Sequence, residues 1–295
     1  MTKAAQESVL APDQVETLLE RFGLSGYPSA DLPGLTTLYD AWCRHVPFDN
    51  ARKLIAVRAA DPAPLPGDSP PEFLDAWLQH GVGGTCWAGN GALCELLRAI
   101  GFTAQRGVGT MMVAPDIPPN HGTVVVELPE GAFVVDASIM HVTPLAIREG
   151  QSVSIDQPAW GVTGHWLGER YAIRWQGLAN PEPFDCRIDE WPVDRQRFAT
   201  QHEMTRTWSP FNFELMFNLV RGDGRIGIAQ NQAAKRDAQG RLTLTALERT
   251  AGGGRLGYLV DELGISEALA ARIPDDVATP PPPGSRTAAR AGDGA

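Results

Sequence analysis

The stretch "GVGGTCWAGNGALCELLRAIGF", residues 81–102, carries both a fold signal and a chemical signal. It begins with a Gly-Gly turn, continues with apolar residues at helical spacing and ends at Gly101, so it predicts an amphipathic helix. Cys86 opens this helix seven positions before Leu93, which places it on the buried side of the first turn. Backbone N–H groups and the helix dipole stabilise an anion there. The sequence therefore predicts a nucleophilic thiolate at Cys86.

The segments on either side of this helix predict different secondary structure. Upstream, residues 12–22, 34–46 and 72–80 have the apolar periodicity of helices. From residue 102 the period changes to two, and short strands follow one another between Gly and Pro turn signals, which is typical of a barrel or a strongly curled sheet. A final helix is expected over 256–273. These patterns predict an α+β protein.

Composition excludes several classes of function. The chain has 295 residues and a formal net charge of −10, which argues against general nucleic-acid binding. No run of about 18 apolar residues is present, and the N-terminus lacks the apolar core of a signal peptide. The four cysteines form no CxxC pair and no histidine or cysteine cluster suggests a metal site. We expect a cytoplasmic protein with free thiols, no metal and no membrane contact.

A nucleophilic cysteine needs a base and a group that orients the base. His121 begins one arm of an expected hairpin and Asp136 lies near the end of the other. With a turn over 128–131, Asp136 faces Thr123, and His121 is its diagonal neighbour on the same face, within reach of a side-chain contact. A three-residue turn would instead separate the two side chains. His141, five residues after Asp136, is the rival base.

Other residues near these three have structural interpretations. Asn90 is one helical turn after Cys86 and is expected to support the site. Cys94 is expected to pack in the core, and Cys43 and Cys186 have no neighbours in sequence that suggest chemistry.

The order of Cys86, His121 and Asp136, together with the motifs around them, resembles the arylamine N-acetyltransferase family. The resemblance rests on Gly-Gly-x-Cys followed by Asn90, on the hairpin "NHGTVVVELPEGAFVVDAS" (120–138), and on "HVPFDN" (45–50), which is similar to a Pro-Phe-Glu-Asn segment of the family. Shorter similarities extend it over about residues 12–275.

This resemblance implies a fold and a division of the chain. We expect a helical bundle with the nucleophile over 1–101, a β-barrel with the His/Asp hairpin over 102–210, and an α/β lid over 211–276. Residues 277–295 are Pro-rich and of low complexity, and we expect this tail to be disordered.

The resemblance also implies a reaction. Cys86 would take an acetyl or other acyl group from acetyl-CoA, with His121 as base and Asp136 holding the imidazole, and would pass the group to an arylamine, hydrazine or N-hydroxyarylamine. Acetyl-CoA is then a co-substrate, and no tightly bound cofactor is needed. A cationic spot must meet the CoA phosphates, for which Arg106 and Arg148 are the weak candidates that flank the hairpin.

The sequence departs from the family pattern at four places, of which Asp49 for glutamate in "PFDN" is a small change. Val82 and Ala88 stand where the family has arginine and glutamate, so both members of a supporting charged pair are replaced together. "DASIM" (136–140) stands where the family typically has Asp-Val-Gly-Phe-Gly, which predicts a changed backbone and a changed pocket.

Two alternatives stay open at this point. The same Cys-His-Asp order serves CoA-independent amide synthases and transglutaminase-like or peptidase-like enzymes. The departures at Val82, Ala88 and 136–140 would also suit a relative that has lost activity.

Overall fold

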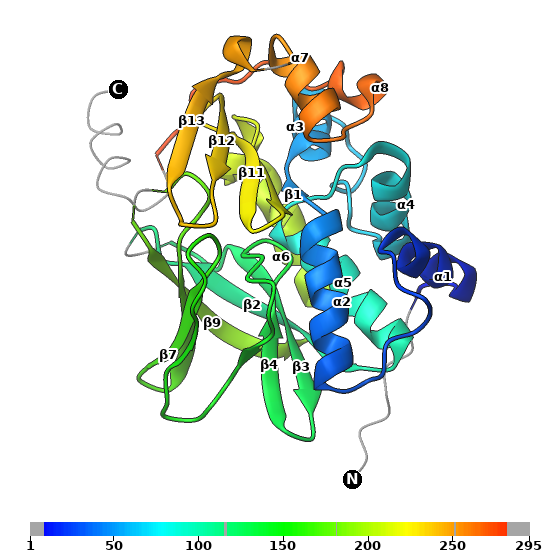
Figure 1. Ribbon diagram of the computed structural model, residues 1–295, viewed down its shortest axis with the longest axis vertical. Helices are drawn as coiled ribbons and strands as arrows, with labels where there is room; N and C mark the ends of the chain where they lie inside the picture. The colour runs from blue at the N-terminus through cyan, green and yellow to red at the C-terminus, as the bar shows by residue number, and fades with distance from the viewer. Residues whose placement is uncertain (1–8, 115–116, 181, 251, 282–295) are drawn as a thin grey trace.

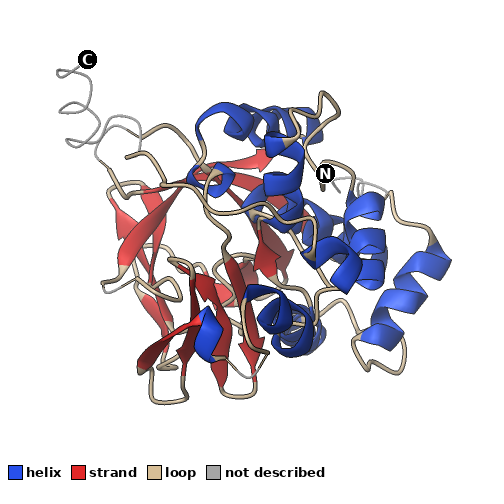
Figure 2. Cartoon of the chain, turned by 90° about the horizontal axis from the view of Figure 1, so that it is seen from above, coloured by secondary structure: helices blue, strands red, loops and turns tan. Residues whose placement is uncertain are grey.

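The computed structural model describes residues 9–114, 117–180, 182–250 and 252–281. Figure 1 shows the main helices on one side of the molecule, a large curled sheet beside them, and a smaller sheet above the large one. Seen from above in Figure 2, most of the strands lie on one side of the molecule and most of the helices on the other. This arrangement is the α+β fold expected from the change in periodicity at residue 102.

The helices and strands have the following bounds. The helices are α1 (Pro12–Arg21), α2 (Leu32–His45), α3 (Ala51–Arg58), α4 (Pro70–His80), α5 (Cys86–Ile100), α6 (Arg195–Trp208), α7 (Arg255–Gly257) and α8 (Glu267–Ala270). The strands are β1 (Phe48–Asp49), β2 (Thr103–Met111), β3 (His121–Leu128), β4 (Gly131–Val135), β5 (Leu145–Ala146), β6 (Val153–Ile155), β7 (Val162–Leu167), β8 (Arg170–Trp175), β9 (Phe184–Val193), β10 (Phe217–Arg221), β11 (Gly224–Ala229), β12 (Gln232–Arg236) and β13 (Leu242–Ala246).

The large sheet is an eight-stranded antiparallel sheet that curls almost into a barrel. Its order is β5-β4-β3-β2-β9-β8-β7-β6, and the edge strands β5 and β6 lie close to each other. Strands β3 and β4 form the expected hairpin: Leu128 pairs with Gly131 and Val124 with Val135. The turn over 128–131 is therefore confirmed, and with it the register that places His121 and Asp136 on one face.

Helix α5 packs against strands β2 and β3. Its buried residues Leu93 and Leu97 belong to one apolar core with Trp42 of α2 and with Val124 and Val126 of β3. Because every second residue of β3 is fixed in this core, the beginning of the strand is fixed against the beginning of the helix. This packing brings the region of His121 to the N-terminal end of α5.

The smaller sheet joins distant parts of the chain. Its order is β1-β10-β11-β12-β13, and β1 pairs with β10, so Phe48 lies opposite Asn218. The Asn50 side chain continues this link, because it donates to the carbonyl oxygens of Phe211 and Glu214 and accepts from the backbone N–H of Met216. The "PFDN" segment is thus an edge strand of the C-terminal sheet.

Two helices lie outside the sequence predictions, and one prediction is wrong. Helices α3 and α6 were not expected. The expected helix over 256–273 is broken into α7, a π-helical turn at Tyr258–Glu262, and α8. Gly264, with φ of +77°, ends the turn, and the next segment docks on α4 through a hydrogen bond from the Ser266 N–H to the His80 carbonyl. Tertiary contact here overrides the helical periodicity.

No helix in the described parts of the chain is long and apolar enough to cross a membrane.

Candidate active site

The Gly-Gly turn before α5 is held by the "PFDN" segment. The Asp49 carboxylate, which is fully buried, accepts hydrogen bonds from the N–H groups of Gly83 (2.6 Å) and Ala51 (3.0 Å). A Cβ at Gly83 would lie 1.8 Å from the Pro47 carbonyl oxygen, so only glycine allows this close approach. Burial raises the pKa of Asp49 to about 6, and the two N–H donors oppose this shift.

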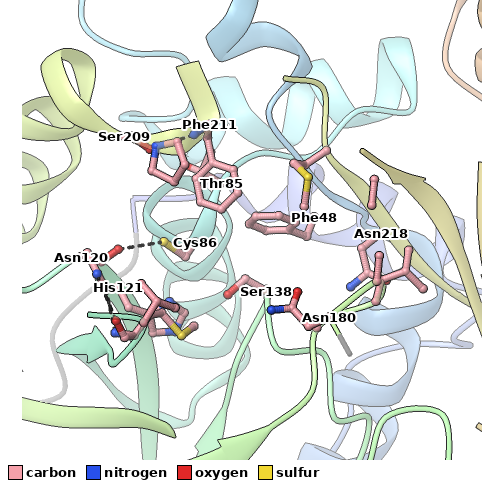
Figure 3. A pocket seen from close by; sticks show the side chains of 18 of the residues that line it. Phe48, Thr85, Cys86, Asn120, His121, Ser138, Asn180, Ser209, Phe211 and Asn218 are labelled. Carbon is pink, nitrogen blue, oxygen red and sulfur yellow. Dashed lines mark hydrogen bonds between the residues drawn. The ribbon is translucent and has the colours of Figure 1, made fainter. Parts of the chain in front are cut away.

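This turn places Cys86 at the first position of α5, as the sequence predicted. The side chain is almost completely buried, and its Sγ lies 3.9 Å from the carbonyl oxygen of Asn120, the residue before His121. Figure 3 shows Cys86 and His121 facing the same hollow, with the Asn120 contact drawn. The structure thus brings the thiol and the imidazole to one place.

His121 and Asp136 form a direct pair. The imidazole Nε2 lies 2.8 Å from Asp136 Oδ2, and both side chains are buried. Because Nε2 is engaged with the carboxylate, Nδ1 is the ring nitrogen left for the thiol proton. The sequence prediction that His121 and Asp136 contact each other across the hairpin is correct.

Asp136 is also fixed through its second oxygen. Oδ1 accepts from the N–H groups of Ser138 (2.9 Å) and Ile139 (3.0 Å), from the Ser138 hydroxyl (2.8 Å) and from Asn90 Nδ2 (3.3 Å). Asn90 further donates to the Gly122 carbonyl and accepts from the Ala137 N–H. Asn90 therefore supports the site, as expected from its position one turn after Cys86.

These contacts determine the charge of the pair. Burial raises the pKa of Asp136, but the charge and hydrogen bond of His121 outweigh burial and hold this pKa well below its usual range. Burial likewise lowers the pKa of His121, but the charge and hydrogen bond of Asp136, together with negative charge on Cys86, raise it well above its usual value. The pair thus favours an ionised carboxylate beside a protonated imidazole.

Tyr39 of α2 is a supporting residue that sequence reasoning missed. Its buried hydroxyl donates to the Asp136 carbonyl (2.9 Å) and accepts from the N–H groups of Asp136 (3.0 Å) and His141 (3.2 Å). One tyrosine thereby anchors the whole turn after β4 to the helical layer. In the sequence it lies within the helical pattern of residues 34–46, and no local pattern distinguishes it.

The rival base His141 points elsewhere. Its Nδ1 lies 2.7 Å from the Thr143 carbonyl, its ring packs edge-on to Tyr39, and burial lowers its pKa to about 4. It does not line the cavity that contains Cys86.

The other three cysteines are free and buried. Burial raises the pKa of Cys94 to about 11 and that of Cys43 and Cys186 to about 12, so all three stay thiols. Cys186 lies on β9 and is nevertheless a near neighbour of His121, which its sequence neighbourhood did not suggest.

A cavity of about 220 Å³ opens beside the thiol, between the barrel, the helices and the smaller sheet. Cys86, His121 and Ser138 line one part of it, with Phe48 and Phe211 nearby (Figure 3). The wall is mainly apolar and aromatic, which suits a small organic substrate.

Two buried cationic side chains also line the cavity. Lys53 of α3 donates from Nζ to Thr205 of α6, and Arg225 of β11 donates to Asn218 Oδ1 (3.0 Å) and to the Gln176 carbonyl (3.2 Å). Burial lowers the pKa of Lys53 to about 7 and that of Arg225 to about 10. No pattern in the sequence distinguishes either residue.

The two arginines expected near CoA do not line this cavity. Arg106 is buried in an ion pair with Glu95, and Arg148 lies over the Phe133 ring at 5.5 Å. That they form the cationic spot for the CoA phosphates stays a prediction. No group of three or more His, Cys, Asp or Glu side chains in the described residues could hold a metal ion.

The departures from the family pattern are accommodated by packing. Val82 is buried in the core of the smaller sheet. Ala88 fills a narrow space, because a Cβ added to Gly67 would lie only 2.5 Å from the Cβ of Ala88. Met140 and Val142, just after the hairpin, have φ of +57° and +64°, in the left-handed region that favours glycine. The chain thus keeps a strained turn there with buried side chains in place of flexible glycines.

An α+β fold that gathers a helix-terminal thiol and a buried imidazole–carboxylate pair at one apolar cavity defines the thiol-dependent acyltransferases and amide hydrolases. Comparison with known proteins narrows this class. The model of an N-acetyltransferase family matches residues 31–252, and the chain belongs to the arylamine N-acetyltransferase family.

Individual relatives agree with this assignment. An arylamine N-acetyltransferase of Mycolicibacterium smegmatis is 29% identical over 195 residues, which are 59% of this chain and 68% of the relative. The fold is similar to that of Salmonella typhimurium arylamine N-acetyltransferase, with TM-score 0.73 and 17% identity over 90% of this chain and 98% of the other. The structure of the Mycobacterium marinum arylamine N-acetyltransferase in complex with CoA is similar with TM-score 0.73 and 19% identity, over 88% of this chain and 98% of the other.

Proposed function

We propose that this enzyme moves an acetyl group from acetyl-CoA, through a thioester on Cys86, to an arylamine, hydrazine or N-hydroxyarylamine. The observation that carries the proposal is the buried His121–Asp136 pair, with Nε2 and Oδ2 2.8 Å apart, at the same cavity as the helix-terminal thiol. Membership of the family supports acyl transfer as the reaction type.

The first half-reaction transfers the acyl group to the protein. With the thiol proton on His121 Nδ1, the Cys86 thiolate attacks the carbonyl carbon of the CoA thioester. The tetrahedral intermediate collapses, the bond from carbon to the CoA sulfur breaks, and CoA leaves as a thiol with the proton returned by the imidazolium. Asp136 holds the imidazole in one orientation and stabilises its protonated form. Proton transfer of this kind contributes about 10²–10⁴-fold in rate.

The second half-reaction releases the group to the acceptor. The amine nitrogen attacks the acyl-Cys86 carbonyl, loses a proton to His121, and displaces the Cys86 thiolate, which regains a proton from the imidazolium. Both half-reactions use the same three residues in sequence, so ping-pong kinetics are expected. Acetyl-CoA is a co-substrate in this scheme, which requires no tightly bound cofactor. The free thiols of the described chain suit a cytoplasmic location.

The first test is intact-protein mass after brief incubation with acetyl-CoA alone. We expect the wild type to gain one acetyl group and Cys86→Ala to gain none. Cys94→Ala, altered in the same helix but away from the cavity, should still gain the group. If the wild type gains nothing from acetyl-CoA or from longer acyl-CoAs while iodoacetamide still labels Cys86 rapidly, CoA chemistry is wrong and amide processing takes its place.

A further inference from the structure

Lys53 is the most unusual polar residue in the cavity. It lies on α3, only 4% of its surface is exposed, and its ammonium group reaches Thr205 alone, at 2.8 Å from Oγ1 and 3.3 Å from the carbonyl oxygen. Among the described residues no carboxylate lies within ion-pair distance of Nζ; the neighbouring Glu203 is paired with Arg206. A buried ammonium with one neutral partner costs stability, so its retention needs an explanation.

The cavity as a whole has the charge of an anion-binding site. Its lining contains Lys53 and Arg225 but, among the residues that the structure describes, no aspartate or glutamate. This is unusual for a chain with a net charge of −10. A cavity lined by cations inside an acidic protein favours an anionic ligand over a neutral one.

The phosphates of CoA do not account for Lys53. Lys53 lines the same small cavity as the Cys86 thiol and is close enough for their charges to interact. In an acyl-CoA the long pantetheine arm separates the thioester from every phosphate, so a cation beside the thiol cannot reach them. Arg225 is the weaker candidate for a ligand contact, because it already donates to two oxygens.

We propose that Lys53 binds a carboxylate carried by a substrate in the cavity beside Cys86. The inference rests on the proposed acyl transfer and names a substrate class for it: either a dicarboxylic acyl group on CoA or an aromatic amine that bears a carboxylate. The ammonium has three donors and Thr205 takes at most two of them. A substrate carboxylate would complete the set with a charge-assisted hydrogen bond.

The pH dependence follows from the same surroundings. Burial lowers the pKa of Lys53 to about 7; Cys86 on α5 and Glu203 on α6 raise this pKa, and Arg206 on α6 lowers it. The buried His202 of α6 also faces Lys53, and burial lowers the pKa of His202 to about 3, so it stays neutral. The ammonium is present below this pKa and lost above it. Preference for a carboxylate over a neutral group should therefore be larger at pH 6 than at pH 8.5.

A binding measurement tests the site without catalysis. Titrations with 4-fluorobenzoate and with neutral 4-fluorobenzamide, followed by ¹⁹F NMR, compare wild type, Lys53→Met and Lys53→Arg. Lys235→Met is the matched control, because Lys235 is exposed on β12. We expect Lys53→Met to lower the affinity for the benzoate by about 10–100-fold relative to the affinity for the benzamide. Lys53→Arg should recover part of this affinity, and Lys235→Met should leave it unchanged. If benzoate binds the wild type and Lys53→Met equally, or does not bind the wild type, the proposal is overturned.

Turnover then identifies which substrate carries the carboxylate. The donor arm compares kcat/KM for succinyl-CoA and butyryl-CoA; the acceptor arm compares 4-aminobenzoate and aniline with one donor. A loss of the carboxylate preference by about 10–100-fold in Lys53→Met, in one arm, assigns the source. Equal losses for charged and neutral substrates in both arms would indicate a base or a structural prop and overturn the proposal. If benzoate binding depends on Lys53 but no acyl-CoA reacts, the carboxylate site stands and the acyl-CoA function fails.

Discussion

The His121–Asp136 pair and Lys53 carry charge in the same buried region, but their surroundings compensate that charge very differently. The carboxylate of Asp136 meets the imidazole on one oxygen and four donors on the other. Lys53 meets a single threonine. In the first case burial is opposed by enough partners to keep the pair charged, whereas in the second burial lowers the pKa of the ammonium to about 7.

The difference separates two uses of a buried charge. A fully hydrogen-bonded pair is positioned for chemistry before any ligand arrives, because its partners hold one geometry. An incompletely bonded ammonium costs stability in the free protein, and a ligand of opposite charge supplies the missing partner. Substitutions at the His121–Asp136 pair should therefore lower the reaction rate. Substitution of Lys53 should instead lower substrate specificity and raise the stability of the protein.

The largest effect is expected for Cys86→Ser. The serine hydroxyl is much less acidic than the thiol, so the same imidazole cannot produce a comparable nucleophile, and turnover should fall by about 10⁴-fold or more. Steady-state rates and a thermal melt measure this, and the melting temperature should stay close to that of the wild type. Cys94→Ala should lose about 1 kcal/mol of unfolding free energy from the core and keep its turnover. Comparable losses of turnover in Cys86→Ser and Cys94→Ala would contradict the assignment of Cys86 as the nucleophile.

Asp136→Asn should have the next largest effect. The amide keeps the size of the carboxylate and can still accept hydrogen bonds at Oδ1, but it no longer stabilises the imidazolium of His121. We expect acylation to slow by about 10²–10⁴-fold, measured by rapid mixing with acetyl-CoA. The pKa of His121, followed by NMR, should fall toward its usual value because a neighbouring negative charge is lost. An acylation rate within threefold of the wild type would show that the fixed carboxylate is not needed.

The positions of Cys86, His121 and Asp136 could be predicted from the sequence, and the surroundings of Lys53 could not. Cys86 is marked by a local pattern, a glycine turn followed by a helix, and the contact of His121 with Asp136 follows from one hairpin register. The information is contained in short segments. Pattern and register then specify the geometry.

The position of Lys53 beside Thr205 depends on two helices that the sequence pattern does not predict. Helix α3 follows the "PFDN" strand with no apolar stripe, and α6 is strongly polar, so neither gave a periodic signal. Lys53 and Thr205 are 152 positions apart, and only the packing of α3 and α6 at the edge of the cavity brings them together. The anchoring of the Asp136 turn by Tyr39, 97 positions away, is long-range in the same sense.

Lys53→Met should stabilise the protein, with a dependence on pH that has a definite sign. The folded pKa of Lys53 lies below its unfolded value of 10.5. Below pH 7 the lysine is charged in both states, and the folded state carries the full cost of burial. Between about pH 7 and 10.5 the unfolded chain binds more protons, so the stability of the wild type rises with pH. We expect Lys53→Met to be about 2–3 kcal/mol more stable at pH 6, and the gap to narrow toward pH 10.

Denaturant unfolding at several pH values measures this gap. Thr205 keeps its hydrogen bond to the His202 carbonyl when the lysine is replaced, so no new unsatisfied group offsets the gain. Lys235→Met is the exposed control and should shift the unfolding free energy by less than about 0.5 kcal/mol at every pH. If Lys53→Met is less stable than the wild type at pH 6, then the contacts of the ammonium offset the cost of its burial as fully as the contacts of Asp136 do.

The smallest effect is expected for Ser138→Ala, which removes one of the four donors to Asp136 Oδ1. Three donors remain, from the backbone of Ser138 and Ile139 and from Asn90, so the carboxylate should hold its place. We expect a loss of about 1 kcal/mol in unfolding free energy and a decrease of no more than about fivefold in acylation rate. Ser154→Ala, whose hydroxyl contacts Thr163 on the surface, is the matched control and should change neither quantity. A decrease near that of Asp136→Asn would mean that the donors act as an all-or-none set. The charge of Asp136 would then depend on every one of its hydrogen bonds, as the charge of Lys53 depends on its single contact with Thr205.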